Sequence, residues 1–573
     1  MKASAPATRR AGEWAAGGAL LLVLGYLVVL PLLILVVAAF RPHGFPFEPG
    51  VTFAHVTNAF LDPGLPRLIS GTLTFAIGAS ALAVMLGLLL AFLLERTDMP
   101  WRGVWRAAVV LPMAMPPMLL GIAWTLLLGP RIGVFNVMLS EWTGVRGPFL
   151  NIYSLSGMIF VEGLALAPSA YLMLAAPVGN IGSAMQEAAA MSAAGPLRRW
   201  LKIDLPLLTP AIAACALVMF VAGLVVFDIP AIIGVPSKII VLSTHIYGLA
   251  HNPPESLPRY GEIGALSFLF IGLLVGLVAL YQRLGARAQR YVAITGRGWR
   301  SSPVPLRAWK YPAVAFVILY FLLTVAAPFA ALLWTSLLPY QARISPDLIG
   351  LLTVSNHLAF FGNARAISAT IHSLEVALLA ASAVAVLAFL VAAYVNRSRG
   401  PGRRIIDLLA AAPLAIPGVM MGMALIFVYL TFDWLPVYGT IWIIVLAFAA
   451  EYLPFGSRAM NGVMSQLHPE LEEAARMSGA APSRVLRKIL LPLFLPAAMA
   501  VWLWVFAHAL RALSAPVMLQ GRDNIVLSTL LWGYWNSGEP TIAAAIGIWL
   551  IVILTLATIG WRLASRRGGA AHV

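Results

Sequence analysis

The dominant pattern along the chain is a series of long apolar runs, separated by short segments that hold most of the prolines, glycines and charges. Each run has about 20 residues or more, enough for a helix to cross roughly 30 Å of hydrocarbon. Backbone exposed to lipid must satisfy its own hydrogen bonds, so the sequence predicts an all-α integral membrane protein. Twelve spans are predicted, near residues 17–40, 68–94, 105–128, 153–178, 207–233, 262–284, 311–337, 370–395, 405–430, 438–460, 493–518 and 541–562.

Composition supports this pattern. Apolar residues make up 61% of the 573 residues and charged residues only 10%, far from the roughly one quarter charged residues of a soluble globule. The net charge of +16 suggests nucleic acid at first. Because the basic residues lie in short clusters between apolar runs, a lipid bilayer is the expected partner and nucleic acid is not. The single cysteine, Cys215, lies inside an apolar run and has no partner for a disulfide or a metal site.

The distribution of Lys and Arg predicts the orientation. With the N-terminus placed in the cytoplasm, the inner segments carry 28 Lys and Arg and the outer loops carry nine. Short cytoplasmic loops are enriched in these residues. The sequence therefore predicts a multi-pass membrane protein with both termini in the cytoplasm.

The two halves of the chain repeat each other. Residues 186–210 align without a gap to 472–496, offset by 286, and 14 of 25 positions are identical. Six spans in each half make the repeat parallel, as in two-bundle transporters. We expect a first repeat at 1–282, a basic cytoplasmic linker at 283–310 and a second repeat at 311–573.

The duplicated segment carries a motif. Each copy, at 183–206 and 469–492, lies on the predicted cytoplasmic side and reads as an amphipathic helix, a small-residue turn and a second basic helix. Small residues in such a turn let another protein approach the backbone closely. The motif positions are Glu187, Ala188, Ala189, Ala193, Ala194 and Gly195 in the first copy, and Glu473, Ala474, Ala475, Gly479 and Ala480 in the second.

This pattern of E-A-A, three residues and G-A resembles the EAA signature of ABC importer permeases. The resemblance implies the type I permease fold, and it implies that both segments are coupling helices that dock on separate ATP-binding subunits, two copies in all. A periplasmic solute-binding protein is the other implied partner, and the bacterial inner membrane is the implied location. Ala193 departs from the family, which usually has glycine there.

The resemblance narrows to the fused, two-in-one permeases of the ferric-iron group, on softer matches at residues 111–117, 151–154 and 227–234. It implies ferric iron as the solute, with thiamine, 2-aminoethylphosphonate and polyamines left open. No G-x-x-x-x-G-K-[ST] phosphate-binding loop occurs in the chain. We therefore expect a transport subunit that is not an enzyme and has no cofactor of its own, with ATP bound by the partner.

Ionisable groups inside membrane spans are costly and usually face the interior of the bundle or a cavity. The candidates to line the passage are Asp228, Arg511, Glu162, Glu451 and His508. Mutual pairing or capping of helix ends is the alternative explanation, and it is slightly favoured for each residue taken alone. No metal site is predicted.

Two other classes compete with this interpretation. A major-facilitator transporter also has twelve spans in two parallel halves, but the loop at 95–103 matches that family's G-x-x-x-D-R-x-G-R-R pattern poorly. A membrane enzyme or channel would need catalytic polar residues or a filter motif in the loops, and none is evident in the sequence.

Overall fold

The computed structural model is helical throughout the part of the chain that it describes. In those residues the only β pairing is an isolated bridge between Thr97 and Val304. The described residues are 7–145, 147–180, 200–251, 258–288, 304–342, 346–398, 400, 402–432, 434–467 and 470–567.

Nine helices of the described chain are long and apolar enough to cross a membrane. Including the 3₁₀- and π-helical turns that extend some of them, their ranges are Trp14–Ala38, Leu65–Arg96, Leu155–Gly179, Lys202–Val225, Arg307–Ser336, Ala364–Arg397, Ile441–Gln466, Arg487–Arg511 and Pro540–Gly560. Their main helices are α1 (Ala7–Leu24) with α2 (Leu30–Ala38), α4 (Leu65–Ala91), α8 (Leu155–Gly179), α11 (Leu205–Val225), α14 (Lys310–Phe321) with α15 (Ala327–Ser336), α17 (Ala364–Arg397), α20 (Ile441–Gln466), α23 (Leu491–Arg511) and α26 (Pro540–Arg567).

The other predicted spans differ in detail. The span expected at 262–284 is α13 (Tyr260–Ala288), whose apolar part among the described residues is Tyr260–Leu273. The spans expected at 105–128 and 405–430 are bent pairs: α5 (Arg102–Val110) meets α6 (Pro117–Leu128) at 94°, and α18 (Arg403–Ala411) meets α19 (Gly418–Thr431) at 112°. Each of the twelve predicted spans therefore has a helical counterpart among the described residues, and a third bent pair, Pro230–Ser237 with Leu242–His251 at 75°, is apolar enough to be a further candidate.

Proline causes the first of these bends. The carbonyl of Met113 would pair with the N–H of residue 117 in a continuous helix, but Pro117 has no N–H. Pro116 also disfavours helical geometry at the residue before it, and Met115 is extended, with φ −89° and ψ 124°. The Met113 carbonyl is therefore left without a partner inside its own helix.

The connection after the fifth span of each half is also broken by proline. Helix α11 ends at Val225, and Val226 is its C-terminal cap. The helix cannot continue normally, because Pro230 has no N–H to donate to the Val226 carbonyl. The Ser243 hydroxyl donates to that carbonyl instead, at 2.6 Å. The second half repeats the arrangement with Ala512, Pro516 and Ser528, whose hydroxyl lies 2.7 Å from the Ala512 carbonyl.

These breaks are followed by short helices that the sequence pattern did not predict as elements. The first half has α12 (Leu242–His251), and the second half has α24 (Pro516–Leu519) and α25 (Leu527–Asn536). The start of each connection is tied to the second span of its own half: the Leu242 amide donates to the Thr72 hydroxyl at 2.9 Å, and the Leu527 amide donates to Ser373 at 2.7 Å. The internal duplication therefore extends to individual hydrogen bonds.

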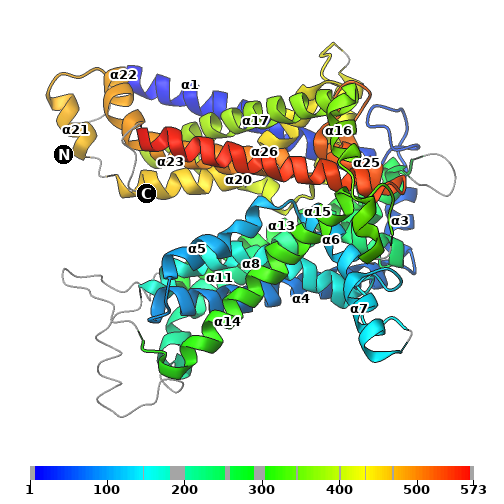
Figure 1. Cartoon of the computed structure of the whole chain (residues 1–573). Helices are drawn as coiled ribbons and strands as arrows, with labels where there is room; N and C mark the ends of the chain where they lie inside the picture. The colour runs from blue at the N-terminus through cyan, green and yellow to red at the C-terminus, as the bar shows by residue number, and fades with distance from the viewer. Residues whose placement is uncertain are drawn as a thin grey trace.

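Each half has a core of three helices. Helices α4, α8 and α11 pack on one another in the first half, and α17, α20 and α23 pack in the same combination in the second. In Figure 1 the two groups form a lower and an upper bundle. They converge toward the end that carries α25 and α16 (Ser355–Gly362), and they spread apart toward the end where the chain termini lie.

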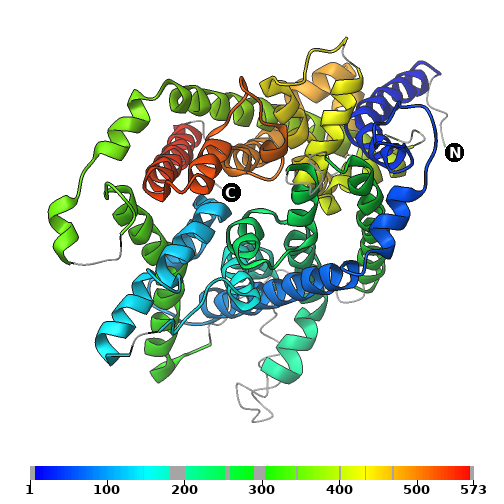
Figure 2. The same ribbon diagram turned by 90° about the vertical axis from the view of Figure 1, so that its right-hand side faces the viewer.

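The first span of each half crosses to the other half. Helix α1 contacts α17 and α18, and α2 contacts α19. In the opposite direction, α14 contacts α5 and α15 contacts α6. Viewed along the bundle, the blue N-terminal helices lie beside yellow segments of the second half (Figure 2). The two halves are therefore interlocked and do not form two separate compact bodies.

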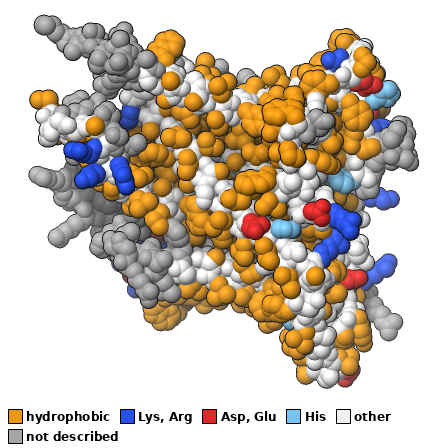
Figure 3. All heavy atoms as spheres, turned by 90° about the horizontal axis from the view of Figure 1, so that it is seen from above, with side chains coloured by type: hydrophobic (Ala, Val, Ile, Leu, Met, Phe, Trp, Pro, Cys, Tyr) orange, Lys and Arg blue, Asp and Glu red, His pale blue; other side chains and the backbone are white. Residues whose placement is uncertain are grey.

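The surface fits a membrane environment. Large apolar side chains point outward along the spans, as at Leu22, Ile77 and Leu378, which are 76%, 56% and 50% exposed. Figure 3 shows a mainly hydrophobic middle with most of the charged side chains toward the two ends. A soluble monomer rarely exposes so much contiguous apolar surface.

Candidate functional site

The second copy of the duplicated segment forms a projecting helical hairpin. After α20 it contains α21 (Glu470–Met477), a turn, α22 (Pro482–Val485) and a wide turn at Leu486–Leu490 that leads into α23. It lies at the same end of the molecule as the chain N-terminus (Figure 1). Ala474 is exposed, and the Met477 side chain is 89% exposed. An apolar side chain this exposed, on a segment outside the membrane-spanning helices, is available to a partner protein.

Gly479 ends α21 in a left-handed conformation. Its φ is +76°, and the Ala480 amide donates to the Ala475 carbonyl at 3.0 Å. A left-handed residue with this hydrogen bond is the Schellman arrangement that closes many helices, and glycine adopts it without strain. A Cβ at Gly479 would meet no atom within 4 Å. The backbone angle, and not crowding, therefore favours glycine at this position of the motif.

Part of the predicted coupling set cannot be placed. The first copy, with Glu187, Ala188, Ala189, Ala193, Ala194 and Gly195, lies outside the described residues. In the second copy Glu473 lies on α21, but its side chain is not among those described. Ala474, Ala475, Gly479 and Ala480 are placed on one helix and the turn that follows it.

The predicted passage residues come together between the halves. Arg511, at the end of α23, donates to the Met113 carbonyl that Pro117 leaves unpaired, and it lies 3.4 Å from the Met115 carbonyl. Its other nitrogen bonds His508 Nε2 at 2.7 Å. Helix α23 of the second half is thus joined to the α5–α6 bend of the first.

Three buried acidic residues are linked to this contact through their charges. Asp228 follows α11, Glu162 lies on α8 and Glu451 lies on α20. The charge of Arg511 acts on Asp228, and the charge of Asp228 acts on both glutamates. Each carboxylate has a buried oxygen with no hydrogen-bond partner among the described residues. All five residues predicted to line the passage therefore belong to one cluster, the acidic cluster, formed by Glu162, Asp228, Glu451, His508 and Arg511.

Sequence reasoning missed two parts of this cluster. The Tyr452 ring lies beside His508, with ring centroids 6.2 Å apart, and the charges of Glu451, Arg511 and Asp228 act on its hydroxyl. Aromatic residues are common inside membrane spans, so nothing in the sequence sets Tyr452 apart as a member of the cluster. The Met113 carbonyl could have been found, because a proline four residues later always removes the helical partner of a carbonyl.

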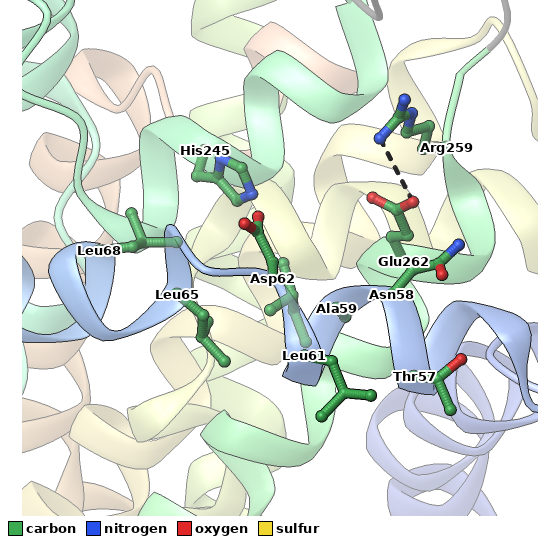
Figure 4. Close-up of a pocket in the computed structure, with 11 residues that line it drawn as sticks. Thr57, Asn58, Ala59, Leu61, Asp62, Leu65, Leu68, His245, Arg259 and Glu262 are labelled. Atoms are coloured by element: carbon green, nitrogen blue, oxygen red, sulfur yellow. Dashed lines mark hydrogen bonds and ion pairs between the residues drawn. The ribbon is translucent and has the colours of Figure 1, made fainter.

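The structure also has a cavity of about 550 Å³ that the sequence gave no sign of. It lies between α12, α13, the start of α4 and α3 (Ala54–Leu61). In Figure 4 the Asp62 carboxylate and the His245 ring point toward each other across it. Glu262 is paired with Arg259 at 3.4 Å. Helix α3 is at the end opposite α21 (Figure 1), so this cavity is remote from the coupling segment.

The second half of the chain matches a known protein family. Residues 365–567 match the family model described as the binding-protein-dependent transport system inner membrane component. The matched region covers α17 to α26, including the whole second copy of the duplicated segment.

Two relatives extend the match over nearly the whole chain, and a third matches less than half of it. The "Ferric transport system permease protein FbpB" of Actinobacillus pleuropneumoniae is 26% identical over 518 residues, which cover 89% of this chain and 73% of that protein. A "Putative ferric transport system permease protein FbpB 1" of Haemophilus influenzae is 25% identical, with 88% and 78% covered. The "Probable sulfate transport system permease protein cysT" of Nephroselmis olivacea is 28% identical over 280 residues, which cover 46% of this chain and 92% of that protein.

These findings confirm the main sequence prediction. The chain is a membrane-embedded permease of the ABC importer class, as the resemblance in its sequence implied. The sulfate permease relative matches less than half of the chain over nearly its own full length. This agrees with two permease units fused in one polypeptide, in the all-helical fold that the sequence predicts.

Proposed function

We propose that this ABC importer permease forms the complete membrane passage of an ATP-driven ferric-iron importer and is driven through its two EAA segments by separate ATP-binding subunits. The observation that carries the coupling role is the projecting α21 hairpin, with its exposed Met477 and its glycine-closed turn. A short rigid helix at the end of the bundle is suited to docking in a cleft of a partner.

The hairpin has a direct path to the passage. The turn at Leu486–Leu490 runs without interruption into α23, whose last turn carries His508 and Arg511. A push on α21 would therefore move the far end of a helix that contacts the other half through Met113. Two ATPase subunits, one under each segment, would close on ATP and shift the bundles between two states that differ in these contacts.

Ferric iron is the proposed solute because the two relatives that match nearly the whole chain are named as ferric permeases. The family name indicates dependence on a solute-binding protein, and we propose a periplasmic one that docks at the end opposite α21. ATP is bound by the partner subunits, and the permease itself needs no cofactor. Thiamine, 2-aminoethylphosphonate and polyamines are the alternative solutes.

Uptake by the reconstituted complex tests this function. The permease, its ATPase and its binding protein are placed in vesicles, and accumulation of radioactive iron is followed with and without ATP. Glu473→Gln should abolish most uptake while the protein inserts normally. Glu375→Gln, an exposed carboxylate on α17 away from the hairpin, is the matched control and should transport normally. Iron accumulation that needs only an ion gradient, or normal uptake by Glu473→Gln, would overturn the proposal.

A further inference from the structure

We infer that the cavity between α3, α12 and α13 receives a basic side chain, lysine or arginine, of the periplasmic solute-binding protein, and that this contact fixes the orientation in which that partner docks. The inference rests on the proposed function, which supplies the partner and places its docking at this end of the molecule. We call the cavity the Asp62 recess. Its polar lining consists of Thr57, Asn58, Asp62, His245, Arg259 and Glu262.

The turn between α3 and α4 holds the Asp62 side chain in place. Asp62 directly follows the last residue of α3, and its Oδ1 accepts from the Gly64 amide at 2.7 Å. The carboxylate points toward the His245 ring across the recess (Figure 4). Because the side chain is already ordered, it loses little conformational entropy when it forms an ion pair with a partner.

The charges of the recess favour a cationic group. Glu262 is already paired with Arg259 at 3.4 Å. Asp62 makes no ion pair in the part of the chain that the structure describes, and no hydrogen bond joins it to His245. An ammonium or guanidinium group would form a charge-assisted hydrogen bond with its carboxylate. An anionic group, including a lipid phosphate, would be repelled.

Helix α16 is the counterpart of α3 in the second half. The bond from the Gly64 amide to Asp62 corresponds, at an offset of 301, to a bond of 2.9 Å from the Arg365 amide to the Asn363 side chain. Helix α3 packs on α13 as α16 packs on α26. The two helices can therefore be compared position by position.

This comparison explains why the first half has room for a recess. Ala59 of α3 corresponds to Phe360 of α16. Phe360 is 7% exposed, and its ring lies parallel to the Trp549 ring of α26, with centroids 6.2 Å apart. An aromatic side chain thus fills, in the second half, the place that an alanine leaves open in the first.

Four polar positions of the recess are apolar in the second half. The offset is 301 for α3, 285 for α12 and 280 for α13, as equivalent hydrogen bonds of the two halves show. The pairs are Thr57 and Leu358, Asn58 and Ala359, His245 and Leu530, and Glu262 and Ile542. Residues that the shared fold requires would recur in both halves. These do not recur, so they serve a contact made by the first half alone.

The outer surfaces of the two equivalent helices are otherwise alike. Leu61 on α3 is 77% exposed and Leu358 on α16 is 66% exposed. Both helices lie at the end opposite α21, and neither is among the membrane-spanning helices (Figure 1). A partner that spans both halves therefore finds an apolar contact on each and a charged recess on one. Complementary charges fix the register of an interface and disfavour the alternative, so the recess distinguishes two orientations that the duplication would otherwise make similar.

The docking rate of the solute-binding protein measures the role of Asp62. The permease–ATPase complex is held in lipid nanodiscs, and the fluorescently labelled solute-binding protein encoded nearest the permease gene is added at low and at high salt. Asp62→Asn should slow association by about fivefold or more at low salt, and by much less at high salt, because exposed charges are screened. Asparagine holds the same turn at residue 363, so this variant should fold. Asp62→Glu keeps the charge and should dock nearly as the unaltered protein does.

Two controls separate the recess from a general effect of charge. Glu141→Gln removes another exposed carboxylate, on α7 at the same end of the molecule, and should leave the association rate unchanged. Asn363→Asp, added to Asp62→Asn, places the charge at the equivalent position of the second half, where Phe360 fills the space. This double variant should dock as slowly as Asp62→Asn alone.

A charge exchange identifies the residue of the partner. Asp62→Lys should weaken docking further, and replacement of one lysine or arginine of the binding protein by aspartate should restore it. Failure of every such replacement, unchanged docking by Asp62→Asn, or an equal loss with Glu141→Gln would overturn the inference. Weaker binding of free spermidine by Asp62→Asn, with docking unchanged, would overturn it as well.

Iron uptake distinguishes failure of this inference from failure of the proposed function. With saturating binding protein, Asp62→Asn should still import iron when ATP is present, because the recess guides docking and takes no part in coupling. Uptake by the unaltered complex together with normal docking by Asp62→Asn refutes the recess and leaves the importer function intact. Absence of uptake by the unaltered complex contradicts the function, and the docking rates still decide the recess.

Discussion

The Arg511 guanidinium donates a hydrogen bond to the backbone carbonyl of Met113 in the opposite half of the chain, 398 residues away. Pro117 removes the helical partner of that carbonyl, and Arg511 replaces it. The charge of the same guanidinium also acts on Asp228. One side chain therefore supplies the missing donor of a bent helix and interacts with a buried acidic residue of the other half, and both roles depend on the two halves being close together.

This pairing predicts the outcome of a double-mutant cycle. Arg511→Met leaves Asp228 without its cation and Met113 without a donor, and should lower the free energy of unfolding by about 2–4 kcal/mol. Adding Asp228→Asn removes the uncompensated carboxylate, so the double variant should regain about 1–2 kcal/mol. Thermal unfolding in detergent measures each variant. Strictly additive effects would show that Asp228 and Arg511 are not coupled.

The left-handed turn at Gly479 predicts a functional defect that a matched glycine does not share. Gly538 follows α25 at the opposite end of the molecule, has φ +79°, and closes its helix with the same bond, from the Glu539 amide to the Tyr534 carbonyl at 3.0 Å. Neither glycine has an atom within 4 Å of an added Cβ. Alanine at either position should therefore cost about 1–2 kcal/mol of backbone strain.

Only Gly479→Ala should uncouple transport, because only that turn shapes the proposed docking helix. The measurement is the ratio of iron imported to ATP hydrolysed in the reconstituted complex, with Gly538→Ala as the control of equal strain. The coupling assignment fails if the two variants have the same ratio.

The crossing of first spans predicts that the linker is dispensable for assembly. Because α1 and α2 pack on the second half and α14 and α15 pack on the first, the halves are held by apolar contacts that do not need a covalent connection. A protease site inserted between residues 289 and 303 should be cleavable with the two fragments still purifying together in mild detergent. Separation of the fragments on a size-exclusion column would contradict the interlocked arrangement.

The contact beside the linker predicts a defined pH response. The Asp98 carboxylate accepts from the Leu306 amide at 2.8 Å and from Lys310 Nζ at 2.9 Å. The Leu306 amide, and after it Lys310, lower the pKa of Asp98. A carboxyl group whose pKa is lower in the folded state stabilises the fold above its ordinary pKa and loses that effect as the pH falls through the lowered value.

Hydrogen exchange at the Leu306 amide measures this response. Its protection factor should be constant between about pH 5 and 8 and should fall only below about pH 4, the ordinary range of aspartate. Asp98→Asn should show weaker protection with no acid transition. A loss of protection between pH 5 and 8 in the unaltered protein would assign the response to another group.

The sequence predicts the spans well because each depends on one local property, a long apolar run. It predicts less well where proline divides a run. The prolines at 112, 116 and 117 are visible as sites of a kink, but the 94° bend of the 105–128 span depends on what packs beneath it. The short helices at 242–251 and 527–536 were missed because they are too short and too polar to read as spans.

The acidic cluster shows a different limit. Each of its five residues stands out in the sequence as an ionisable group within a span, and this is enough to name them. Glu162 and Glu451 are 289 positions apart in the sequence. Both interact with the charge of Asp228 only because of the way the two halves face each other. The packing of α1 and α14 on the opposite halves is likewise hidden, because an apolar face does not indicate which half it packs against.

The central claim is that α21 is the contact with the ATPase, and site-specific cross-linking tests it most directly. Cys215, the one native cysteine, is buried, so a cysteine placed at Met477 on α21 is the single accessible thiol. The control is Met138→Cys on α7 (Val134–Thr143), a methionine that is 59% exposed at the opposite end of the molecule. Met477→Cys should cross-link to the ATP-binding subunit with a yield that changes with ATP, and Met138→Cys should not. Cross-linking of the ATPase to Met138→Cys, or none to Met477→Cys, would contradict the account.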